Sequence, residues 1–117
     1  MYDSMRDSIG ITLLMLGYDI NTRNADEVAA ARDALIAQKN IRKGFFGDDI
    51  KDAMINDQGA LAVVYSGDAM MCTDPEYGNS KLAYAVPNEG SNVWIDNMII
   101  PKTSTKQAIV EEFINFL

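Results

Sequence analysis

The chain has 117 residues, of which 48% are apolar and 23% charged, and its formal net charge is −7. This length supports one domain with a modest core, and an acidic chain without an evident basic patch is a poor partner for nucleic acid or anionic membranes. The lack of histidine removes the commonest general base, and a single cysteine, Cys72, excludes an intramolecular disulfide and any cysteine-cluster metal site. No metal and no cofactor is therefore expected.

The first residues carry no leader pattern. Met1-Tyr2-Asp3-Ser4 lacks the charged and then apolar form of a signal peptide. No apolar run approaches the ~20 residues that a membrane-spanning helix needs. The sequence therefore predicts either a cytoplasmic protein or a piece of a longer one.

The first predicted helix begins after Asp3 or Ser4. Asp7 follows Ser4 at the spacing of a capping box. Gly17 is a suitable end, because glycine readily adopts the left-handed conformation that closes many helices. The apolar stripe of this helix consists of Ile9, Leu13, Leu14 and Leu16.

Two further helices are predicted before the middle of the chain. The second is capped by Asn24, with Glu27 at the reciprocal position, and runs to about Lys39. The third is short and begins near Asp48. The residues expected to face the core are Val28, Ala31, Leu35 and Ile36 in the second helix and Ile50, Met54 and Ile55 in the third.

Three strands and two more helices are predicted in the second half. Residues 60–65 and 82–86 are continuous apolar runs, as expected of strands covered on both faces. Residues 92–101 form a third strand, which ends at a proline. A short helix is expected at 70–73, and a last helix at 106–117 with a stripe of Ile109, Phe113 and Phe116.

Helices that alternate with apolar strands predict an α/β layered architecture. In such folds ligands bind beyond the carboxyl ends of the strands, where loops lead into helices. Tyr65-Ser66-Gly67-Asp68 occupies a position of this kind. The same pattern is also compatible with tight packing alone.

The third strand carries the most distinctive pair of side chains. Trp94 is the only tryptophan, and Asp96 stands two residues further on, so both project from the same side of a strand. A flat π-face beside a carboxylate suits an organic ammonium, through cation–π attraction and charge-assisted hydrogen bonds. The alternative is a core strand in which Trp94 is buried and Asp96 caps a turn.

Four segments, residues 2–7, 64–69, 86–90 and 94–101, together resemble the spermidine/putrescine-binding proteins of bacterial ABC importers. The resemblance rests on Pro-x-Glu-Gly, on Trp-x-Asp and on the final Ile-Pro, and it covers nearly the whole chain. It implies a type II periplasmic-binding-protein fold, in which two α/β lobes close over a solute. Residues 1–117 would form one lobe, a mixed sheet flanked by helices, and residues 97–117 a crossover segment that belongs to the other lobe.

The resemblance also implies the binding residues. Trp94 would stack on the methylenes of a polyamine, and Asp96 would pair with an ammonium group. Tyr65 lies where the family often has tryptophan, so the aromatic wall of the binding site would be narrower here. The full set implied is Ser4, Asp7, Tyr65, Asp68, Trp94 and Asp96.

Three of these positions also suit a structural role. Asp7 falls where an acidic residue of the family takes a terminal amine, although an acid in a first helical turn also favours the helix dipole. Ser4 replaces a second acid found in some members, and it also suits a cap. Asp68 is expected to support the loop after Tyr65 and to reach ligand only secondarily.

The implied partners are a polyamine and an ABC permease in the membrane. The implied location is periplasmic or at the cell surface, with a lipid anchor in a Gram-positive source. Without the other lobe, the last helix would either fold back on its own lobe or be exchanged between two chains, giving a swapped homodimer.

Other interpretations remain at this point. The same pair of side chains suits another small organic cation, and the chain could be a non-catalytic interaction domain. An enzyme that uses Asp7 and Asp96 for acid–base chemistry is disfavoured, because no phosphate loop and no activated nucleophile is recognisable.

Overall fold

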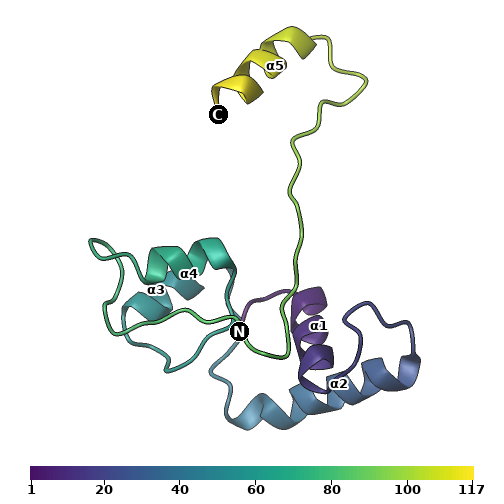
Figure 1. Cartoon of the computed structure of the whole chain (residues 1–117), viewed down its shortest axis with the longest axis vertical. Coiled ribbons are helices and arrows are strands. Elements are labelled where there is room, and N and C mark those ends of the chain that lie inside the picture. The colour runs from purple at the N-terminus through teal and green to yellow at the C-terminus, as the bar shows by residue number, and fades with distance from the viewer.

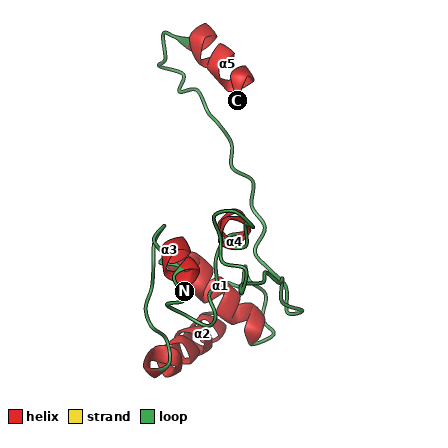
Figure 2. Cartoon of the chain, turned by 90° about the vertical axis from the view of Figure 1, so that its left-hand side faces the viewer, coloured by secondary structure: helices red, strands yellow, loops and turns green.

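The computed structural model describes all residues 1–117 and is helical, with no β-strand. Helices α1 and α2 pack against each other, as do α3 and α4, whereas α5 contacts no other helix (Figures 1 and 2). None of the helices is both long and apolar enough to span a bilayer. The elements are α1 (Met5–Met15), α2 (Ala25–Ala37), the 3₁₀ helix η1 (Gln38–Asn40), α3 (Ile50–Ile55), α4 (Ser66–Cys72) and α5 (Gln107–Phe116).

Helix α1 begins and ends as the sequence predicts. The Ser4 hydroxyl accepts a hydrogen bond from the Asp7 amide at 3.3 Å and so caps the first turn. At the other end Gly17 has a φ of 80°, in the left-handed region. The amides of Gly17 and Tyr18 donate to the carbonyls of Leu14 and Leu13, which is the Schellman arrangement.

Helix α2 also has its predicted cap, but its buried face is narrower than predicted. The Asn24 side chain accepts from the Asp26 amide at 3.0 Å and donates to Glu27 at 3.3 Å. Ala31 is completely buried, whereas Ile36 is 61% exposed. The assignment of Ile36 to the core is therefore wrong, because only α1 covers α2 and one neighbouring helix can bury only a narrow stripe.

A small apolar cluster lies under α3 and α4. Ile50, Met54 and Cys72 form its centre, as predicted for the two α3 residues. A parallel bridge between Tyr2 and Phe46 brings the N-terminus to this cluster, with hydrogen bonds from the Asp3 amide to the Phe46 carbonyl and from the Phe46 amide to the Met1 carbonyl. The surrounding half-buried residues are Tyr2, Phe46, Ile55, Ala62, Val64 and Leu82.

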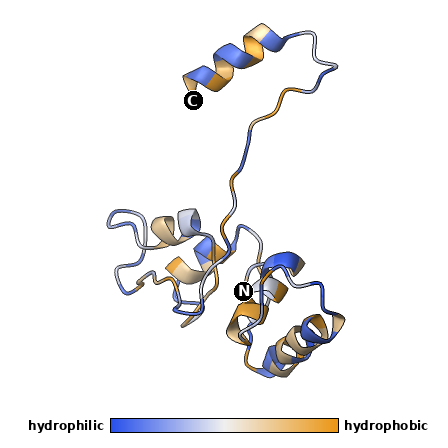
Figure 3. Cartoon of the chain, turned by 45° about the vertical axis from the view of Figure 1, so that its right-hand side comes forward, coloured by the Kyte–Doolittle hydropathy of each residue, from blue (hydrophilic) through white to orange (hydrophobic).

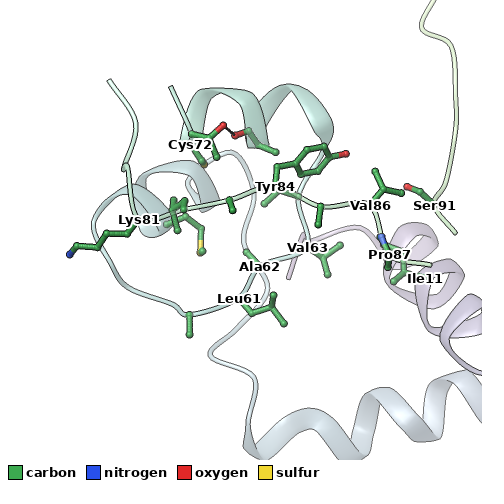
Figure 4. A pocket seen from close by; sticks show the side chains of 18 of the residues that line it. Ile11, Leu61, Ala62, Val63, Cys72, Lys81, Tyr84, Val86, Pro87 and Ser91 are labelled. Atoms are coloured by element: carbon green, nitrogen blue, oxygen red, sulfur yellow. Dashed lines mark hydrogen bonds between the residues drawn. The ribbon is translucent and has the colours of Figure 1, made fainter. Parts of the chain in front are cut away.

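The predicted mixed sheet is not formed. Residues 61–64 and 83–86 run as extended chain, and their backbone groups make no backbone hydrogen bond. A cavity of about 520 Å³, lined by apolar side chains from both segments, lies where pairing would be expected (Figure 4). An apolar run becomes a strand only when a second strand completes its ladder, and neither segment has such a partner within the chain.

Residues 91–106 carry α5 away from the other helices (Figure 1). The radius of gyration is 18.1 Å, against about 13 Å for a compact domain of this length. The apolar residues of α5 lie on an exposed stripe, with Ile109 65% and Phe113 59% exposed (Figure 3). Helix α5 therefore forms at its predicted place but does not pack against the other helices.

Candidate functional site

Three aromatic rings from distant parts of the chain meet beside the N-terminus of α1. The ring centroids of Tyr65 and Trp94 are 4.8 Å apart with planes at 69°, an edge-to-face contact. The centroids of Tyr65 and Tyr2 are 4.2 Å apart at 48°. Trp94 is 47% exposed, so it is a partly open wall and not a core side chain.

The carboxylate of Asp7 is the polar centre of this cluster. Its Oδ2 accepts hydrogen bonds from the Ser4 hydroxyl at 2.6 Å and the Tyr65 hydroxyl at 2.7 Å. Its Oδ1 accepts from the Asn92 amide group at 2.9 Å. Because Asp7 lies in the first turn of α1, the helix dipole also favours its negative charge.

These contacts set the charge state of the two titratable groups. Burial alone would raise the pKa of Asp7, but the hydrogen bonds from Ser4, Tyr65 and Asn92, with the nearby Arg6, outweigh it and hold the pKa below its usual value. The hydrogen bond to Asp7, followed by burial, raises the pKa of Tyr65. Asp7 is therefore an anion and Tyr65 a neutral donor at neutral pH.

Sequence reasoning missed two members of the cluster, Asn92 and Tyr2. Asn92 stands two residues before Trp94, so an extended chain places both on one side, and this spacing could have identified it. Tyr2 had no such signal, since the bridge to Phe46 is what brings it there. Its hydroxyl donates to Asp48 at 3.0 Å; burial and then Asp48 raise the pKa of Tyr2 to about 12.

The other two predicted residues lie outside this hydrogen-bond network. Asp96 is exposed and makes no hydrogen bond or ion pair within the chain. Asp68 pairs with Lys51 at 3.4 Å, between the first turn of α4 and α3. This ion pair gives Asp68 a role in joining two helices.

The arrangement offers aromatic faces and carboxylate charge but no metal-binding cluster. No group of three or more acidic or cysteine side chains is placed to hold a metal ion. Aromatic faces attract alkylammonium groups, and a carboxylate can accept their N–H groups. The site therefore suits an organic cation better than an inorganic one.

The profile of bacterial extracellular solute-binding proteins matches residues 1–117. The chain belongs to this family. Its members bind solutes and are not catalytic, which agrees with the prediction that the chain is not an enzyme. The predicted resemblance to polyamine-binding proteins is confirmed by the relatives that match.

Several curated relatives are similar over most of this chain. A putrescine/agmatine-binding protein of Pseudomonas aeruginosa is 28% identical over 103 residues, which are 86% of this chain and 28% of the relative. The spermidine/putrescine-binding periplasmic protein 1 of Haemophilus influenzae is 22% identical over 117 residues, all of this chain and 32% of the relative. A spermidine/putrescine-binding periplasmic protein of Salmonella typhimurium is 26% identical over 115 residues, 98% of this chain and 32% of the relative.

The chain thus spans less than a third of the length of these relatives. No solved structure matches it.

Proposed function

We propose that the chain is part of the solute-binding component of a bacterial ABC importer and binds an aliphatic polyamine of the putrescine and spermidine class. The observation that carries this proposal is the contact of the half-exposed Trp94 with Tyr65 directly beside the Asp7 carboxylate. The names of the curated relatives, putrescine- and spermidine-binding proteins, support the same solute class. Binding would be extracytoplasmic, with delivery to a membrane permease.

Asp7 and Asp96 would hold the two ammonium ends. A carboxylate has about four acceptor sites, and three of those of Asp7 are occupied by Ser4, Tyr65 and Asn92, which leaves one on Oδ1. An ammonium N–H would take that site. Asp96 has no partner within the chain and is free to pair with the second ammonium.

The remaining residues would shape the site. Trp94 and Tyr65, whose rings touch each other edge to face, would line one side of the methylenes between the ammonium groups. The distance between the two carboxylates would select ligand length. Ser4 would act through Asp7, to which it donates, and Asp68 would keep α4 in place through Lys51. Strongly hydrated metal cations would be disfavoured, because aromatic walls cannot replace their water ligands.

We also propose that residues 97–117 belong with a second lobe in a longer protein. In support, α5 has an exposed apolar stripe and no contact with the helices of this chain. In the isolated chain two copies would exchange this segment. Light scattering tests the exchange: a monomer at all concentrations contradicts it.

The binding proposal is tested by isothermal titration of putrescine, spermidine and agmatine into this chain and into the longer protein that contains it. Trp94→Leu should weaken binding about fivefold to thirtyfold, the value of a partly desolvated cation–π contact, while Trp94→Phe should retain part of it. Asp7→Asn should also weaken binding. Asp26→Asn is the matched control, because Asp26 occupies the first turn of α2 and lies outside the site.

Absence of polyamine binding by the longer protein would refute the proposed solute. An equal loss of polyamine affinity in Asp7→Asn and Asp26→Asn would refute the assignment of the site.

A further inference from the structure

We propose that Asn92 is a positioning residue that fixes the segment carrying Trp94 to the N-terminus of α1, so that the aromatic wall is assembled before any ligand arrives. Its Nδ2 donates to Oδ1 of Asp7 at 2.9 Å across 85 residues of sequence. The consequence for ligand affinity rests on the proposed function. The positioning itself is a property of the free chain.

This contact is the sole hydrogen bond by which the C-terminal part of the chain is held. Among the hydrogen bonds of residues 91–117, all others join near neighbours, such as the Ser104 amide to the Pro101 carbonyl and Asn97 to the Ile95 carbonyl. The other contact that holds this segment is the one between the rings of Tyr65 and Trp94, and Trp94 lies two residues after Asn92. Loss of the Asn92 contact would therefore release Trp94 from Tyr65, since nothing else polar retains the segment.

The chemistry of Asp7 makes Asn92 well suited to this role. A hydrogen bond to a charged acceptor is worth more than one between neutral groups, and Asn92 lies in a half-buried position where water competes less. A neutral amide also leaves the charge of Asp7 intact. An ammonium of the ligand could then use the remaining acceptor site of Oδ1 without displacing Asn92.

The variant Asn92→Asp converts this contact into a pH-dependent one. Two carboxylates at this distance repel each other when both are ionised, and they share a proton when the pH falls. The other charged or titratable groups facing Asp7 are the Arg6 guanidinium and the Tyr65 hydroxyl, and the hydrogen bond to Asp7 raises the pKa of Tyr65, so that hydroxyl stays neutral between about pH 5 and 8. The native contact should therefore be independent of pH over this range.

The experiment is acrylamide quenching of Trp94 fluorescence, because Trp94 is the only tryptophan. At pH 7.5 we expect the acrylamide quenching constant of Trp94 to be about twofold higher in Asn92→Ala and Asn92→Asp than in the native chain. The reason is that the Trp94 ring is 47% exposed in the native chain and would become fully exposed on release. For Asn92→Asp the quenching should return toward the native value as the pH falls toward about 5, as the carboxylate pair takes up a proton. Asn97→Asp is the matched control, because Asn97 bonds only to the nearby Ile95 carbonyl.

Native quenching in both Asn92 variants at every pH would overturn the inference, as would an equal change in Asn97→Asp. Far-ultraviolet circular dichroism of the same samples checks that the helices persist. Polyamine titration is a separate measurement, in which Asn92→Ala should bind about fivefold to thirtyfold more weakly, as Trp94→Leu should, because Asn92 acts through Trp94. Release of Trp94 in the Asn92 variants, together with no polyamine binding by the longer protein, would support the positioning role and refute the proposed solute, so the two failures are distinguishable.

Discussion

The hydroxyl of Tyr65 should stabilise the folded chain only while Asp7 is ionised. Tyr65→Phe removes the 2.7 Å donor to Asp7 and leaves the ring contacts with Tyr2 and Trp94. Hydrogen bonds to charged groups contribute about 1.5–3 kcal/mol. Asp7 and Tyr65 are only half-buried, and Ser4 and Asn92 still donate to the carboxylate in the variant. Tyr65→Phe should therefore lower the free energy of unfolding by about 1 kcal/mol at pH 7.

The pH dependence follows from the lowered pKa of Asp7. A carboxyl whose pKa is lower in the folded chain contributes stability that is complete above its unfolded pKa and is lost as the pH falls through the folded pKa. The difference in the free energy of unfolding between the native chain and Tyr65→Phe should therefore be constant from pH 7 to about 5 and should shrink below about pH 4.

The assay is urea unfolding followed by far-ultraviolet circular dichroism at pH 7, 5, 4 and 3. The control is Tyr18→Phe, because the Tyr18 hydroxyl makes no hydrogen bond within the chain. No loss of stability at pH 7, or a loss of the same size at pH 3, would refute the reasoning that Tyr65 acts through the charge of Asp7.

Three further predictions concern the ends of helices and the exposed last helix. Gly17→Ala should lower the free energy of unfolding by about 1 kcal/mol, because the φ of Gly17 is 80°. Gly67→Ala is the control and should not lower it, because Gly67 has equally open surroundings but no positive φ. Thermal melts of the two variants test this. Ser4→Ala should cost about 1 kcal/mol through loss of the α1 cap, and unchanged stability in urea would contradict that role. Phe113→Asp should abolish any dimer seen by light scattering, because it places a charge in the exposed stripe of α5, and a dimer that persists would mean another interface.

Local signals in the sequence were sufficient for the first two helices, whereas α4 begins at Ser66, four residues before its predicted start at Met70. The capping pattern at Ser4 and Asp7, the glycine at 17 and the Asn24 cap each act within one turn, and each is present in the structure. Such contacts depend on neighbours in sequence, so a single sequence contains the information needed.

The sheet could not be predicted in the same way, because strand pairing depends on partners far along the chain. Residues 60–65 and 82–86 have the apolar character of buried strands, yet neither has a ladder partner in this chain. The pattern indicates what a segment can do when paired. It does not indicate whether a partner is present.

The candidate site was predicted in part. Tyr65, Trp94, Asp7 and Ser4 do come together, although they lie up to 90 residues apart, and the resemblance to a family was what grouped them. Asp96 stands apart from the hydrogen-bond network, because no strand fixes residues 92–101. Asn92 could have been found from its spacing to Trp94, whereas Tyr2 depends on a tertiary bridge.

The unpaired apolar segments also affect how the protein behaves at high concentration. Residues 61–64 present free backbone N–H and C=O groups along an apolar run, with Leu61 91% exposed. Such an edge is a template on which another extended chain can add as a strand. Concentrated samples should therefore self-associate through β-structure that a dilute sample lacks, and the 520 Å³ cavity would close as that added strand supplies the missing ladder.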